Sequence, residues 1–145
     1  MAKNADADNV SIVRYTDEVI PPGTYIFRVD NVSYHREEMY EDPDGYYNTA
    51  EIWASTEDGK EMYEKFRIDE RPSDGKFKVK VKRFEALATT IENMTGLNKP
   101  VTTITKKMVE GLRGRFFEAT IYHQEYNDVK YPHIDPDSVV PKSSF

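Results

Sequence analysis

Apolar and polar residues alternate with a period of two along residues 46–68, on both sides of a short turn at 56–59. Such alternation predicts two β-strands joined as a hairpin, with successive side chains on opposite faces. The side chains predicted to face the core are Ala50, Ile52, Ala54, Met62, Phe66 and Ile68. Those predicted to face outward are Tyr47, Thr49, Glu51, Trp53, Tyr63, Lys65 and Arg67. The outward face therefore mixes large rings with cations, whereas a purely structural hairpin usually has polar residues there.

A strong strand signal, TYIFRVDNVSYH, follows the Pro-Pro-Gly step at 21–23. One face of this strand carries Tyr25, Phe27 and Val29. A bulge near Asp30 and Asn31 would return Val32 and Tyr34 to the same face. We therefore expect a bent first strand.

The acidic segment 36–45 contains Asp-Pro-Asp-Gly, a tight-turn signature, and predicts a solvated loop. Asp42, Asp44 and Glu51 fall at the spacing of some calcium ligands, but Tyr40 stands where the first carboxylate is required. We therefore expect no metal ion in this loop.

The second half of the chain predicts two helices and two strands. Ser73 is a suitable N-cap for a helix over about 74–95, and Gly96 suits its end. Residues at helical spacing in that segment are Phe77, Val81, Phe84, Leu87, Ala88, Ile91 and Met94. Thr105 can cap a short second helix that Gly114 ends, and RFFEATIYHQEY then alternates as a strand. A last strand at 129–134 is restricted to a sheet edge or strand end by Pro132.

Three strands, a helix and two strands follow one another in the order of an OB-fold. We therefore predict a mainly β (β+α) class: a small five-stranded OB-like barrel over residues 21–134, with its helix between strands 3 and 4. A split barrel, or a sandwich with an inserted helix, would give a similar pattern. The polar ends predict a mobile N-terminal arm at 1–20 and a disordered C-terminal tail at 135–145.

Composition narrows the classes of function. The 145 residues include no cysteine, which excludes disulfides, thiolate metal sites and cysteine nucleophiles. The formal net charge of −6 argues against a protein that coats a polyanion with its whole surface, but a local cationic site remains compatible with it. The chain has no run approaching the roughly 20 apolar residues that span a bilayer. We expect a soluble cytoplasmic protein with no membrane contact.

Motifs of catalysis and cofactor binding are missing from the sequence. There is no phosphate-cradling glycine loop and no nucleophile elbow, and the three histidines show no metal-ligand spacing. We therefore expect no catalytic residue, no metal and no cofactor, and a protein that is not an enzyme.

The remaining candidate chemistry is binding of single strands, which requires rings for base stacking and cations for phosphates. The outward set Tyr47, Trp53, Tyr63, Lys65 and Arg67 offers both, and we predict that Arg28, Arg115 and Tyr122 extend it. A structural alternative is that Trp53 and Tyr63 form a cross-strand aromatic pair, or are covered by the arm or a second subunit. Pairing of Glu51 with Lys65 or Arg67 would weaken the binding hypothesis.

The succession PPGTYIFRVDNVSY, GYYNTAEIWAS, GKEMYEKFRI, RFEALATTI and GLRGRFFEATIYH resembles a domain family, long of unknown function, found in the replication and recombination cassettes of tailed bacteriophages. The resemblance covers about residues 21–134, and its motifs are markers of the fold. It implies an OB-like barrel that binds single-stranded DNA and works with phage or host recombination and replication proteins. The chain departs from the acidic Pro-Phe ending of many single-strand-binding proteins, because its terminal Phe145 follows only a thin acidic run.

The sequence thus leads to two hypotheses. The first is a sequence-tolerant single-stranded-DNA-binding protein of phage replication or recombination. The alternative is a structural or protein-interaction module, such as a virion component or an assembly adaptor, in which the aromatic face is a subunit interface of an oligomer.

Overall fold

A computed structural model describes residues 19–40, 42–70 and 77–145. Most of the predicted N-terminal arm, residues 1–18, lies outside the described residues. No helix among the residues that the structure describes is long and apolar enough to span a bilayer.

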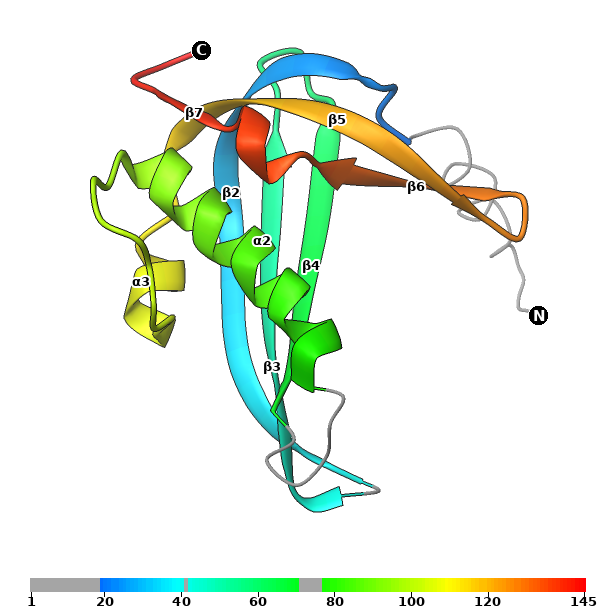
Figure 1. Cartoon of the computed structure of the whole chain (residues 1–145). Helices are drawn as coiled ribbons and strands as arrows, with labels where there is room; N and C mark the ends of the chain where they lie inside the picture. The colour runs from blue at the N-terminus through cyan, green and yellow to red at the C-terminus, as the bar shows by residue number, and fades with distance from the viewer. Residues whose placement is uncertain (1–18, 41, 71–76) are drawn as a thin grey trace, which may run out of the picture.

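The protein is mainly β, as predicted, and is built on an antiparallel sheet of six strands (Figure 1). These are β2 (Gly23–Met39), β3 (Asp42–Ser55), β4 (Glu61–Glu70), β5 (Phe116–Tyr126), β6 (Val129–Ile134) and β7 (Val140–Lys142). The order across the sheet is β4-β3-β2-β5-β6, and the short β7 pairs with β5. The predicted five-stranded OB-like barrel is met only in part: the sheet has a sixth strand, and no ladder joins its ends β4 and β6 in the described chain.

In the described part of the chain between β4 and β5 lie two helices, where the sequence places them. Helix α2 (Phe77–Thr95) crosses the sheet diagonally in Figure 1 and packs against β4. Helix α3 (Lys106–Glu110) is short, and the predicted cap is confirmed: the Thr105 hydroxyl accepts a hydrogen bond from the Met108 N–H at 3.2 Å.

The core lies between α2 and the face of the sheet that we call the inner face. Its largest fully buried side chains include Phe27, Phe66, Phe117, Ile52, Leu87 and Ile91. The predicted bulge is confirmed, since the pairing of β2 with β3 shifts between Val29 and Asn31. This shift keeps both Val29 and Val32 buried, although an unbroken strand would place them on opposite faces.

The ends of the sheet, β4 and β6, are joined by one buried carboxylate. Glu64 on β4 is only 3% exposed. Its Oε1 accepts the backbone N–H of Ile134 at 2.7 Å, and its Oε2 lies 3.0 Å from Nδ1 of His133. A side chain thus bridges two strand edges that no ladder joins in the described chain.

The prediction of a loop at 36–45 is wrong. β2 continues to Met39 and β3 begins at Asp42, so the hairpin is longer than expected. The register steps from the Glu38–Tyr46 pair to the Met39–Asp42 pair, which places residues 43–45 in an irregularity of β3. Three of the four turn-forming residues therefore lie in this irregularity, and pairing with β2 resumes beyond them at Asp42.

The C-terminal residues also differ from the predicted disordered tail. Pro136–Ser138 form a 3-10 turn, η1, and β7 pairs with the start of β5. Val139 is buried in the core, and the ring of Phe145 lies 5.0 Å from that of Phe116. One buried valine and a terminal ring anchor a segment whose polar composition suggested disorder.

Candidate nucleic-acid interface

The face of β3 and β4 that points away from the core carries all five residues predicted as its binding platform. We call this surface the outer face and define it by Tyr47, Thr49, Glu51, Trp53, Tyr63, Lys65, Arg67 and Asp69. Register pairs across it are Trp53 with Tyr63, Glu51 with Lys65, Thr49 with Arg67, and Tyr47 with Asp69. The pairing of β3 with β4 is continuous from Tyr46 to Ser55, so the alternation is unbroken and Trp53 stays on the outer face.

Trp53 and Tyr63 form a cross-strand aromatic pair. Their ring centroids are 5.3 Å apart and their planes are inclined at 40°. Tyr63 remains 41% exposed and Trp53 is half-buried. The cross-strand aromatic pair named as the structural alternative is therefore present. Both rings nevertheless keep surface that a ligand could contact.

Glu51 is held by two hydroxyl groups. The Tyr63 hydroxyl donates to it at 2.5 Å and the Ser33 hydroxyl at 2.8 Å. The Tyr63 hydrogen bond is the main cause that lowers the pKa of Glu51. Burial, followed by the Glu51 carboxylate, raises the pKa of Tyr63 to about 12. Among the described residues Glu51 forms no ion pair within 4.0 Å with Lys65 or Arg67, the pairing that would have weakened the binding hypothesis.

Arg67 and Tyr47 bring a cation and a ring together. The Arg67 guanidinium lies 4.2 Å from the centroid of the Tyr47 ring, and its Nε donates to Asp69 at 3.1 Å. Half of the Arg67 side chain stays exposed while the Asp69 carboxylate is buried. The stacking contact and the ion pair fix the guanidinium, which leaves its free N–H groups directed to solvent.

A cleft of about 470 Å³ adjoins the Trp53 end of the outer face. Trp53, Tyr63 and Lys65 line one side of it, and Tyr131 and His133 of β6 line the other. The acidic side chains of Asp30, Glu61 and Glu64 also reach it. The sequence did not predict Tyr131 or His133 as site residues, because nothing local indicates that β6 would meet β4.

The other three predicted residues lie at different distances from the platform. Arg28 precedes the bulge of β2 and pairs in register with Ser55, two residues from Trp53, and its Nε donates to Asp30 at 2.9 Å. Tyr122 on β5 packs against His133, with ring centroids 5.5 Å apart, so it supports the β6 side of the cleft. Arg115 is not brought to the face: its Nε donates to the Gly111 carbonyl at the end of α3, at 3.2 Å.

Within the part of the chain that the structure describes, no group of three or more His, Asp or Glu residues is placed to hold a metal ion. His123, which the alternation places inward, has its Nε2 within 2.7 Å of the Ile20 carbonyl.

Comparison with known proteins adds no relative: no protein-family model matches the chain, and no curated protein matches it. The resemblance to the phage family therefore stays a prediction from the sequence motifs.

Proposed function

We propose that the outer face of β3 and β4 binds single-stranded DNA with little sequence preference, by base stacking and phosphate contacts. The observation that carries this proposal is the pairing of rings and cations on two neighbouring strands: Trp53 with Tyr63 at one end, Tyr47 with Arg67 at the other. Trp53 lies six positions after Tyr47 on β3, which corresponds to about 20 Å of extended strand. That length suits several successive nucleotides of a single strand.

The strand order supports an OB-like interpretation of the same sheet. If β2 to β6 correspond to the five strands of an OB-fold, the outer face lies on the second and third, the usual site for oligonucleotides in that fold. The cleft beside β6 would then adjoin the loop between the fourth and fifth strands, which is also part of that site. The Glu64 bridge between β4 and β6 supports this interpretation, since it brings the two ends of the sheet together.

The biological setting is proposed from the sequence motifs alone. A role in phage replication or recombination, in the host cytoplasm and with phage or host replication proteins as partners, follows from the resemblance of residues 21–134 to the phage family.

Binding of a labelled oligothymidylate, followed by fluorescence anisotropy, tests the proposal. The double variant Lys65→Glu, Arg67→Glu should lower the affinity at least about tenfold, because it replaces two phosphate-binding cations with anions. The slope of log affinity against log salt should decrease by about 1.4, given roughly 0.7 per lost phosphate contact on a single strand.

The matched control is Lys106→Glu, Lys107→Glu, which makes the same change in net charge on exposed positions of α3. This control should bind almost like the original protein. Equal loss of affinity in both double variants would show a general charge effect and contradict a site on the outer face.

A subunit interface on the same face is the competing function. The cross-strand contact of Trp53 with Tyr63 and the carboxylates Glu51 and Asp69 on that face are compatible with it. Light scattering separates the two: an oligomer that dissociates on Trp53→Ala substitution, with no affinity for the oligonucleotide, would favour the interface.

A further inference from the structure

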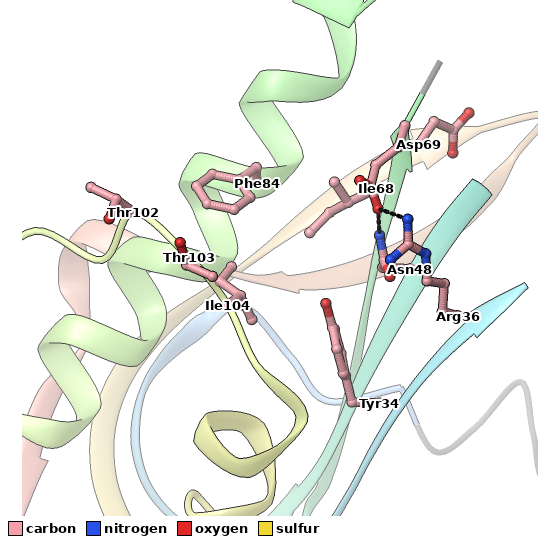
Figure 2. Close-up of a pocket in the computed structure, with 10 residues that line it drawn as sticks. Tyr34, Arg36, Asn48, Ile68, Asp69, Phe84, Thr102, Thr103 and Ile104 are labelled. Atoms are coloured by element: carbon pink, nitrogen blue, oxygen red, sulfur yellow. Dashed lines mark hydrogen bonds and ion pairs between the residues drawn. The ribbon is translucent and has the colours of Figure 1, made fainter. Parts of the chain in front are cut away.

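A second cleft, of about 510 Å³, opens on the inner side of the sheet (Figure 2). In this region β2, β3 and β4 extend past α2 (Figure 1). Tyr34, Asn48 and Ile68, which line the cleft, have the inward phase of the alternation. Asp69 is the one outer-face residue that also reaches it. The linker before α3 forms the opposite wall with Thr102, Thr103 and Ile104. Its volume is within the range of small-molecule sites.

One end of this cleft is polar and fixed in orientation. The Glu70 carboxylate accepts a hydrogen bond from the side-chain amide of Asn48 and forms an ion pair with Arg36, with Nη2 3.4 Å from Oε2 (Figure 2). Asn48 is only 8% exposed, so its amide cannot turn freely. The Arg36 guanidinium is stacked on the Tyr46 ring at 4.3 Å, which holds its plane. These contacts arrange a carboxylate, an amide and a guanidinium before any ligand arrives.

These polar groups keep unused hydrogen-bonding capacity. Among the described residues, no hydrogen bond engages Oε1 of Glu70 or Oδ1 of Asn48, and both atoms are acceptors. Arg36 keeps further N–H donors, because one of its nitrogens faces Glu70. Burial, followed by the Glu70 carboxylate, raises the pKa of Tyr34, so its hydroxyl stays a donor at neutral pH.

The other end of the cleft is apolar. Phe84 from α2, Ile68 from β4 and Ile104 from the linker line it together with the ring of Tyr34. Figure 2 shows Phe84 and Tyr34 on opposite sides of the opening, with Ile104 on the side of the linker and Ile68 on the side of β4. Such walls favour a flat ring system over an extended polar chain.

The charges at the polar end limit the class of ligand. Arg36 and Glu70 neutralise each other, and Asp69, which also lines the cleft, is paired with Arg67. A phosphate or another anion therefore gains little there. An aliphatic lipid would leave the buried amide of Asn48 without a partner for its oxygen, which is unfavourable. The class of ligand that remains is an uncharged planar heterocycle with hydrogen-bond donors and acceptors on one edge.

We propose that this inner cleft binds a nucleobase, with guanine preferred, as a site distinct from the outer face. Guanine presents two neighbouring donor groups, N1–H and the exocyclic N2 amino group, beside the O6 acceptor. The donors match the free oxygens of Glu70 and Asn48, and O6 matches an N–H of Arg36. The ring lies between Phe84 and Tyr34. Adenine and thymine each offer fewer donors on the corresponding edge and bind more weakly.

Titration of the isotope-labelled protein with guanosine, followed by NMR, tests this site. The side-chain amide signals of Asn48 should shift saturably with guanosine, and adenosine, thymidine and ribose should bind at least about tenfold more weakly, the loss expected when a hydrogen bond to a charged group is missing. Glu70→Gln should lower the guanosine affinity by about the same factor, because it replaces an acceptor with a donor.

Glu85→Gln is the matched control, since it removes a carboxylate from an exposed position of α2 outside the cleft. It should leave guanosine binding unchanged. The proposal is overturned if guanosine does not shift the Asn48 amide, or if Glu70→Gln and Glu85→Gln bind it equally. A circular dichroism melt of each variant shows whether it is folded, and Arg36→Gln, at a half-exposed side chain, is the second variant if Glu70→Gln unfolds.

A second experiment distinguishes a base of a bound DNA strand from a free nucleoside or nucleotide as the ligand of the inner cleft. A thymidine oligonucleotide containing one guanine is compared with the all-thymidine strand in the Trp53→Ala protein. Tighter binding of the guanine-containing strand, abolished by Glu70→Gln, identifies a base of a bound strand; equal binding of the two strands, with free guanosine still bound, identifies a free nucleoside or nucleotide. Binding of guanosine tests the inner cleft, and binding of oligothymidylate tests the outer face. Either proposal can therefore be contradicted while the other stands.

Discussion

The two faces of the β3–β4 hairpin share one backbone and carry opposite kinds of side chain. On the inner face, Ala50, Ile52 and Phe66 are almost completely buried under α2 and the rest of the core. On the outer face, Tyr63, Lys65 and Arg67 are exposed. On the inner face, small and large apolar side chains together fill the space of the core. On the outer face, Tyr47 contacts the Arg67 guanidinium and the Tyr63 hydroxyl binds Glu51, and neither contact is required to pack a core. The inner face therefore accounts for the fold, and the outer face is available for function.

The largest effect should come from breaking the inner face. Phe66→Ala should lower the free energy of unfolding by about 3–5 kcal/mol, because it removes a fully buried ring and leaves a cavity. Tyr63→Ala, three positions earlier on the opposite face, should cost only about 1–2 kcal/mol through loss of the Trp53 pair and the Glu51 hydrogen bond. Urea denaturation measures both. Equal losses would show that the two faces are not energetically distinct.

A smaller effect should follow from Glu64, the buried carboxylate on the inner face that bridges β4 and β6. Glu64→Ala leaves the Ile134 N–H and His133 without their acceptor, and should cost about 1–3 kcal/mol. Glu64→Gln should recover much of this loss, because its amide oxygen can still accept from Ile134. Hydrogen exchange at the Ile134 amide should accelerate in the alanine variant. If exchange there is unchanged, the bridge between β4 and β6 is not a stabilising contact.

The smallest effect concerns the hydrogen bond between Tyr63 and Glu51 and its dependence on pH. The folded-state pKa of Glu51 lies below its ordinary value of 4.5, so its contribution is present above pH 4.5 and is lost as pH falls through the lowered pKa. The folded-state pKa of Tyr63, about 12, lies above its ordinary value of 10.0, so its contribution is present below pH 10.0 and is lost as pH rises through 12.

Tyr63→Phe should therefore destabilise the protein by about 0.5 kcal/mol between these limits, a value at the low end for a hydrogen bond because the site is largely exposed. The difference from the original protein should shrink at both extremes of pH. A difference that is independent of pH would show that the hydroxyl acts through packing and not through Glu51.

Period-two alternation was sufficient to predict the two faces of the hairpin, including the outward direction of Trp53. It succeeded because the β3–β4 register has no irregularity along Tyr46–Ser55, so each residue keeps its face. The bulge in β2 was also predictable, since Val29 and Val32 would otherwise fall on opposite faces.

The features that the sequence did not reveal depend on contacts between distant segments. The β2–β3 pairing extends past the Asp-Pro-Asp-Gly turn signature, most of which lies in an irregularity of β3. β7 forms because the start of β5 has a free edge with which it can pair. The cleft between Trp53 and Tyr131 requires β6 to curve back to β4. The one local signal of that contact was Glu64, a charged residue at an inward position of an alternating strand.

Intrinsic fluorescence tests the proposed function of the outer face most directly, because Trp53 is the only tryptophan of the chain. Titration with an oligothymidylate should quench this fluorescence saturably, and the apparent affinity should fall steeply as salt is raised. The Lys106→Glu, Lys107→Glu protein should show the same quenching, and the Lys65→Glu, Arg67→Glu protein should show it only at much higher concentrations of oligonucleotide. Unchanged Trp53 fluorescence at micromolar protein, with no salt-dependent binding, would contradict a nucleic-acid site on the outer face.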